Sequence, residues 1–156
     1  MQYVRFEGCG SEEGLRDEIG RLVSMGILSQ KEADRVRQDQ ILSFFKTDLG
    51  MRLVSGAECI REYKFSILDP ASNYAEGLEG EQVLLQGVVD CAVMDREGIT
   101  VIDFKTDRVT DETVLEVVDR YRPQVMAYSD ALGRIFETQV RERYLYFFSI
   151  GRYVSI

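Results

Sequence analysis

The sequence predicts an α/β domain in which a central mixed β-sheet is flanked by helices. Amphipathic helical patterns occupy the first third of the chain and recur over residues 110–136. Between them lie three strand-like segments, at 58–67, 83–94 and 99–106, and two more strand-like segments end the chain. Helices, three strands, a helix and two strands, in that order, indicate a single domain over residues 1–156.

The first two helices are predicted from their capping residues. Ser11 precedes an acidic first turn, so a helix is expected over residues 11–25, with Gly26 ending it. Ser29 stands three residues before Glu32, which is the capping-box spacing, and opens a second helix. The apolar part of this second helix consists of Ile41, Leu42, Phe44 and Phe45.

Two further helical segments follow. A short helical turn is expected over residues 48–54. Residues 110–136 have a helical pattern and are expected to form two pieces. Pro123 fits the first turn of the second piece, where its missing N–H costs little.

Turn signals separate the strands. The polar connection over residues 68–82 contains Pro70 and Asn73 and is expected to be a surface loop. A short polar turn, "DREG", joins the next two strands into a hairpin, "GVVDCAVMDREGITVIDFKT". The segments "VRERYLYFFSI" and "RYVSI" are the last two predicted strands.

Composition narrows the functional classes. A net charge of −8 argues against a simple basic nucleic-acid-binding surface, but bound divalent cations would change the local field of a nucleic-acid enzyme. The chain has no histidine, which argues against serine–histidine and cysteine–histidine hydrolases. It also has no P-loop motif, and so no ATP-driven motor of its own.

Other features predict a cytoplasmic protein that is not attached to a membrane. No apolar run is long enough to span a bilayer, and the N-terminus lacks a signal-peptide pattern. Cys9, Cys59 and Cys91 are widely spaced and are interpreted as reduced thiols.

The predicted hairpin carries charges in apolar strands. If its turn is centred between Arg96 and Glu97, Asp90 lies directly opposite Asp103, and opposed Cβ atoms are about 4.5–5.5 Å apart. Lys105 lies two residues beyond Asp103 and projects from the same face. Two opposed carboxylates repel each other unless something compensates them. A turn offset by one residue would break this pairing.

This arrangement has two interpretations. Two carboxylates beside an ammonium suit a hard, oxygen-liganded divalent cation such as Mg²⁺ or Mn²⁺. Such a cation polarises phosphoryl oxygens and lowers the pKa of a bound water, and the lysine orients or deprotonates that water. The alternative is a solvated salt-bridge face on which Lys105 merely offsets one aspartate.

Three more polar residues are candidates for the same site. Gln124 and Tyr128 lie one helical turn apart and would suit a phosphate or a nucleobase, or they are ordinary polar residues of a helix face. Glu62, on the strand before the hairpin, would complete the carboxylate shell of the metal, or it is an exposed strand residue with no role.

Together, "EYKF", "GVVD", "DFK" and "QVMAY" resemble the E-x-x-F, G-x-x-D, D-x-K and Q-x-x-x-Y motifs of RecB-type nucleases, in the PD-(D/E)XK superfamily. The closer resemblance is to the C-terminal nuclease domain of the AddA family of helicase–nucleases. It extends from about Gly26 to the end of the chain and includes "SFFKTDLGMRLVSG" and "RYRPQVMAYSDAL". The resemblance implies a restriction-endonuclease-like core.

The resemblance also implies an activity and a set of site residues. The implied activity is Mg²⁺- or Mn²⁺-dependent hydrolysis of DNA during the processing of double-strand-break ends for recombinational repair. Asp90, Asp103 and Lys105 would be catalytic, and both aspartates would bind the metal together with the backbone carbonyl of Phe104. Glu62, Gln124 and Tyr128 would be supporting active-site or DNA-contact positions.

The implied partners belong to a larger assembly. They are a DNA single strand unwound from a duplex end and a protein of the AddB type. ATP would act only through a motor region that this chain lacks. The family pattern begins with a helix carrying a metal-binding histidine, which is absent here. We therefore expect a fragment that starts after this helix, or a protein that has lost the ligand.

Two alternative functions use the same fold. One is a catalytically inactive module that holds DNA or docks a protein. The other is a different enzyme of the superfamily, such as a stand-alone or CRISPR-associated exonuclease.

Overall fold

The computed structural model describes residues 1–156 and is built on one five-stranded sheet. Its strands are β1 (Cys59–Pro70), β2 (Gln82–Asp95), β3 (Gly98–Lys105), β4 (Val140–Phe147) and β5 (Arg152–Ser155), and they lie side by side in that order. β3 and β4 are parallel, whereas the other three neighbouring pairs are antiparallel. The predicted α/β domain with a central mixed sheet is confirmed.

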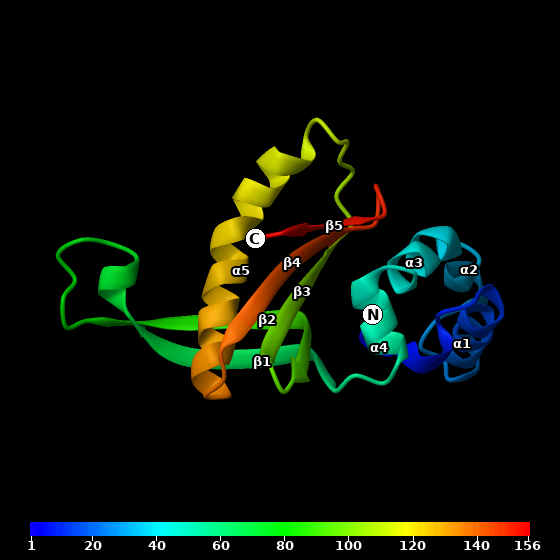
Figure 1. Ribbon diagram of the computed structural model, residues 1–156, viewed down its shortest axis with the longest axis horizontal. Helices are drawn as coiled ribbons and strands as arrows, with labels where there is room; N and C mark the ends of the chain where they lie inside the picture. Colours follow the sequence, from blue (N-terminus) through cyan, green and yellow to red (C-terminus); the bar gives the residue numbers. More distant parts are fainter.

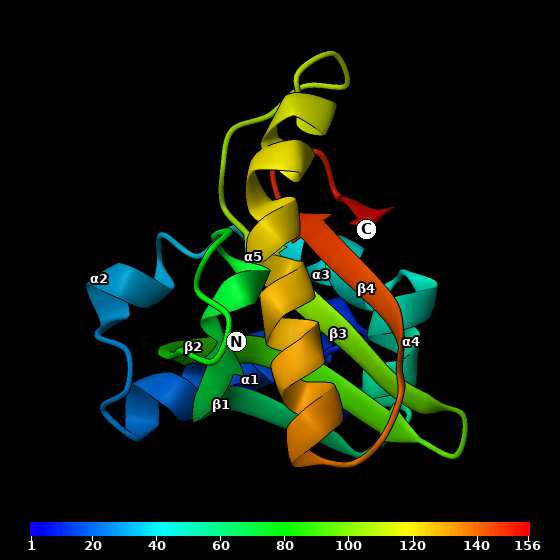
Figure 2. The same ribbon diagram turned by 90° about the vertical axis from the view of Figure 1, so that its left-hand side faces the viewer.

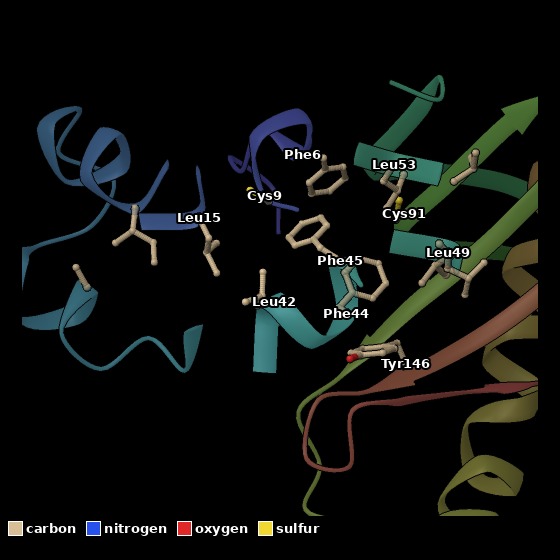
Figure 3. Packing of buried hydrophobic residues seen from close by; sticks show 14 residues of the cluster. Phe6, Cys9, Leu15, Leu42, Phe44, Phe45, Leu49, Leu53, Cys91 and Tyr146 are labelled. Atoms are coloured by element: carbon tan, nitrogen blue, oxygen red, sulfur yellow. The ribbon is translucent and has the colours of Figure 1, made fainter. Parts of the chain in front are cut away.

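The N-terminal helices cover one face of this sheet (Figure 1). They are α1 (Glu12–Ser24), α2 (Gln30–Ala33), α3 (Gln38–Phe45) and α4 (Asp48–Val54), preceded by the 3-10 turn η1 (Phe6–Gly8). Their apolar side chains form one core with the sheet, in which Phe44 packs edge-on against Tyr146 of β4 at a ring-centroid distance of 4.8 Å (Figure 3). The predicted caps are present, because Ser11 caps α1 and Ser29 and Glu32 form a capping box.

A single long helix, α5 (Val114–Ile135), covers the opposite face. It crosses in front of β3 and β4 in Figure 2, and the N-terminal helices lie behind the sheet. Beyond α5, β1 and β2 continue as a two-stranded hairpin that ends in a loop containing the 3-10 turn η2 (Ala71–Asn73) (Figure 1). No helix has both the length and the hydropathy required to cross a membrane.

The second helix is not continuous as predicted, because it is divided into α2 and α3. Ala33 of α2 and Phe45 of α3 both belong to the core under the N-terminal helices. A straight helix would place these residues about 18 Å apart along its axis, at about 1.5 Å per residue. The two pieces instead pack separately against α1.

The last helix also differs from the prediction, but here the structure has fewer breaks than expected. The sequence predicts two pieces, but α5 continues through Pro123 without a break. Pro123 is exposed, so water can reach the carbonyl that its ring leaves without a partner. Val118, Val125 and Leu132 anchor the helix on both sides of the proline. Tertiary packing therefore outweighs the local cost of the proline.

The predicted loop over residues 68–82 is shorter in the structure. β1 extends to Pro70 and β2 begins at Gln82, and these two residues pair directly. Pro70 is tolerated because it is the last residue of a strand at the edge of the sheet.

Candidate active site

The register of the β2–β3 hairpin brings the two aspartates together. Cys91 pairs with Ile102 and Asp95 pairs with Gly98, so the turn is centred as predicted. One step beyond the Cys91–Ile102 pair, the same register places Asp90 opposite Asp103. Cys91 projects to the other face, into the core under the N-terminal helices. The predicted position of the turn is confirmed, and its register supports the predicted opposition of Asp90 and Asp103.

Asp103 is an unusually buried carboxylate. Only 4% of the residue is exposed, because α5 covers this face of the sheet. Burial raises the pKa of Asp103, the contact with Lys105 opposes this rise, and the charge of Asp90 adds to it. Its Oδ2 atom lies 2.5 Å from Lys105 Nζ but receives no hydrogen bond of regular geometry. Asp103 is therefore a buried carboxylate that is held directly against the Lys105 ammonium.

Lys105 is held from two sides. Its Nζ contacts Asp103, and it also lies 3.7 Å from the ring centroid of Tyr121, which projects from α5. The hydroxyl of Tyr121 donates to Asp107, with oxygen–oxygen distances of 3.3–3.4 Å. A cation over an aromatic face is attracted by the ring quadrupole. Tyr121 thus links the ammonium to the loop that follows β3.

Asp90 is oriented by the backbone. Its Oδ2 accepts a hydrogen bond of 2.9 Å from the N–H of Phe104, the residue between Asp103 and Lys105. The Phe104 side chain points to the opposite face, where its ring packs edge-on against Phe44. Only the backbone of Phe104 therefore faces the two aspartates.

The pairing of β1 with β2 is interrupted beside the site. Glu62 and Asp90 stand opposite each other without pairing, although the strands pair on both sides of them. Glu62 has a φ of +50°, in the left-handed region that non-glycine residues rarely adopt. Val89 and Ala92 both pack under α5, although residues three positions apart in a regular strand lie on opposite faces. Such local strain is common at functional sites.

Glu62 does not join the two aspartates in a ligand cluster. No three acidic, cysteine or histidine side chains lie close enough together to hold a metal ion. The role of Glu62 as a third carboxylate ligand therefore stays a prediction.

Gln124 and Tyr128 lie on the flank of α5 that faces the outer hairpin. The side-chain amide of Gln124 donates to the hydroxyl of Tyr128 at 3.0 Å. The ring of Tyr128 packs edge-on against Phe65 of β1, with a centroid distance of 5.3 Å. It also covers Gly87, where an added Cβ would lie 2.5 Å from a ring carbon of Tyr128. Residues of three of the four motifs, Phe65, Gly87 and Tyr128, are thus in direct contact.

The geometry fits a hard divalent cation. Two carboxylates on facing strands, Asp90 and Asp103, supply the negative charge and the oxygen donors. Mg²⁺ usually keeps several waters and needs only one or two protein carboxylates. Two aspartates are therefore sufficient as protein side-chain ligands.

Sequence reasoning does not single out Tyr121 or Asp107. Both flank predicted site residues, at positions three before Gln124 and two after Lys105. Nothing in the local pattern shows that Tyr121 reaches Lys105, since the contact depends on how α5 crosses β3.

Comparison with known proteins agrees with this geometry. A sequence profile of the PD-(D/E)XK nuclease superfamily matches residues 13–152. The chain is also similar to the A-type subunits of ATP-dependent helicase/nucleases. One from Clostridium botulinum (strain Loch Maree) is 32% identical over 161 residues, and one from Bacillus mycoides is 33% identical over 166 residues. A third, from Alkaliphilus metalliredigens, is 32% identical over 158 residues.

The match covers 99–100% of this chain but only 12–13% of each of these relatives. The matched part is the C-terminal region of those proteins, which confirms the resemblance predicted from the four motifs. With a superfamily profile that spans most of its length, and with the opposed aspartates and the lysine in one buried site, the chain belongs to the PD-(D/E)XK nuclease superfamily.

Proposed function

We propose that this chain is a metal-dependent deoxyribonuclease domain that hydrolyses phosphodiester bonds. The observation that carries this proposal is the opposition of Asp90 and Asp103 with Lys105 in contact, in a chain of a nuclease superfamily. A solvated ion pair would not require a buried carboxylate beside a second one. A metal-binding site accounts for such a pair, because a cation compensates the repulsion between the two carboxylates.

We assign Asp90 and Asp103 as ligands of Mg²⁺ or Mn²⁺, with the Phe104 carbonyl and Glu62 as further candidates. When bound, the cation lowers the pKa of a coordinated water and polarises a phosphoryl oxygen. The Phe104 N–H holds Asp90 in place by donating to its Oδ2. Preorganised ligands avoid the cost of reorganisation during the reaction.

Lys105 is the residue that contacts the reacting phosphate in this proposal. Its Nζ lies between Asp103 and Tyr121, where it can donate to a phosphoryl oxygen or orient the attacking water. Gln124 and Tyr128 are proposed to contact the DNA strand through the amide and the phenol. Their mutual hydrogen bond fixes the two groups relative to each other, and the packing of Tyr128 on Phe65 fixes them relative to the sheet.

The wider role follows from the names of the relatives, which describe a subunit of an ATP-dependent helicase/nuclease. We propose that the chain cleaves single strands unwound from duplex ends, during the processing of double-strand breaks for repair. The motor that uses ATP and an AddB-type partner would belong to the larger assembly. A chromosomal substrate implies a cytoplasmic location.

The test is cleavage of an end-labelled single-stranded oligonucleotide with Mg²⁺ or Mn²⁺. Asp103→Asn and Lys105→Gln are each expected to reduce the rate by roughly a hundredfold or more, because each removes charge stabilisation of the reaction. Asp17→Asn and Lys31→Gln make the same chemical changes at exposed positions outside the site and should leave the rate unchanged. Full activity in both site variants would rule out the proposal.

A non-catalytic DNA-holding or docking module is the second candidate. The observation in its favour is that only two carboxylates converge and that the chain has no histidine. Calorimetric titration with Mn²⁺ separates the two functions. The nuclease proposal predicts binding that is lost in Asp103→Asn, whereas a holding module predicts no binding to either protein.

A further inference from the structure

A cavity begins one residue beyond the candidate active site. It has a volume of about 470 Å³ and lies between α3 and the segments that follow β3 and β4. Thr106, which directly follows Lys105, lines it. The N–H of Phe148, another lining residue, donates to the Lys105 carbonyl at 3.1 Å. The cavity and the catalytic lysine are therefore connected through the end of β3.

The charge of this cavity is opposite to that of the protein. Arg37 and Arg108 are its only charged side chains, and no acidic residue lines it, although the net charge of the chain is −8. Arg108 forms no salt bridge. Arg37 donates two long hydrogen bonds, both of 3.4 Å, to the exposed carboxylate of Asp39. Arg108 is thus available to an anion, and Arg37 can exchange its weak, exposed ion pair with Asp39 for one.

The lining of the cavity also offers an apolar surface. Val36, Ile41 and Phe148 contribute apolar side chains, all partly buried at the margin of the core under the N-terminal helices. The ring of Phe148 stacks on Phe104 at a centroid distance of 5.8 Å, which limits its movement. An aromatic ring next to arginines suits a ligand with both a planar base and a phosphate.

The position of the cavity relates it to the substrate. It lies on the sheet face covered by the N-terminal helices, whereas Asp103 and Lys105 lie under α5. Thr106 is located where the chain leaves β3, between these two regions. A strand that crosses this end of β3 would contact both.

We propose that this cavity binds one nucleotide of a single-stranded DNA substrate, with a phosphate on Arg37 and Arg108 and the base against Phe148. The nucleotide belongs to the same strand whose neighbouring phosphodiester reaches Asp103. The inference rests on the proposed nuclease function and assigns it a substrate-binding subsite.

The experiment measures binding of a fluorescent single-stranded oligonucleotide by anisotropy over a range of salt concentrations. All proteins carry Asp103→Asn, so that cleavage is suppressed during the measurement. Arg37→Gln combined with Arg108→Gln should weaken binding at least about tenfold at low salt. It should also reduce the slope of log affinity against log salt by about 0.7 for each lost phosphate contact.

Two further variants test whether the location of the arginines and the aromatic ring of Phe148 each contribute to DNA binding. Arg16→Gln removes an exposed arginine on α1 that forms no salt bridge, and it should leave the slope unchanged. Phe148→Leu keeps an apolar side chain but removes the ring, and it should weaken binding by roughly tenfold without changing the slope. Circular dichroism at the assay temperature shows that each variant is folded.

The outcomes separate this inference from the proposed function. An unchanged affinity and slope in the double arginine variant overturns the subsite, even where cleavage by the parent chain depends on Asp103. Absence of DNA binding by the Asp103→Asn chain also overturns it. Loss of binding in the double arginine variant supports the subsite even where the parent chain fails to cleave. Failure of the parent chain to cleave would contradict the proposed nuclease activity but not the subsite.

Discussion

Gly87→Ala tests whether the contacts among the sequence motifs organise the site. The added Cβ would lie 2.5 Å from Tyr128 Cε1 and 2.9 Å from Phe65 Cε1, whereas carbon atoms in favourable contact are about 3.5–4.0 Å apart. Neither ring can withdraw easily, because the two rings pack edge-on against each other. Overpacking of this kind costs about 1–3 kcal/mol in the free energy of unfolding. Tyr128 and its hydrogen bond to Gln124 should also shift.

Urea denaturation and the cleavage rate measure the two effects. Gly20→Ala is the matched control, because a Cβ added at Gly20 in α1 would have nothing within 4 Å and alanine favours helices. It should stabilise the protein by about 0.5–1 kcal/mol. Replacing Tyr128 by leucine in the Gly87→Ala protein should recover part of the lost stability but not the cleavage rate. Normal stability together with normal cleavage in Gly87→Ala would contradict this prediction.

Three further predictions concern Lys105, the long helix and acid stability. Tyr121→Leu should lower the cleavage rate by roughly tenfold or more, because it releases the ammonium of Lys105. Tyr121→Phe keeps the ring and should retain most of the rate. Equal rates in the two variants would argue against a role for the ring. Pro123→Ala should raise the free energy of unfolding by about 1–3 kcal/mol, since α5 is continuous and Pro123 is exposed. A loss of stability would instead favour the two separate helical pieces predicted from the sequence. The hydrogen bonds from Arg21 lower the pKa of Glu18 in the folded protein. The pair therefore stabilises the fold at pH values above the unfolded-state pKa of Glu18. This stabilisation is lost as the pH falls through the folded-state pKa. Arg21→Ala should therefore flatten the dependence of stability on pH in the acid range, as measured by thermal melts from pH 3 to about pH 7; an unchanged dependence would show that the pair does not contribute.

The opposition of Asp90 and Asp103 can be predicted from the sequence because hairpin geometry is local. A short turn sets the register, and the two-residue period of a strand then decides which side chains share a face. The same logic places Lys105 beside Asp103 and Cys91 on the other face, and the structure agrees on both. Helix caps are equally local, and the predicted capping box at Ser29 is confirmed.

Features that depend on tertiary packing cannot be predicted in this way. The left-handed conformation of Glu62 occurs at a non-glycine residue and has no local signal. The continuity of α5 through Pro123 depends on buried residues on both sides of the proline. Gly87 is part of a sequence motif, but the reason for a glycine becomes clear only when Tyr128 lies across it.

We propose that Asp90 and Asp103 bind the same divalent cation, and that DNA cleavage requires this cation. The most direct measurement is the rate of single-strand cleavage as a function of Mn²⁺ concentration, for the parent chain and for Asp90→Asn. We expect a saturable metal dependence in the parent chain and a rate near background in Asp90→Asn at every concentration. The same rate and the same half-saturating Mn²⁺ concentration in both proteins would show that Asp90 does not hold the cation.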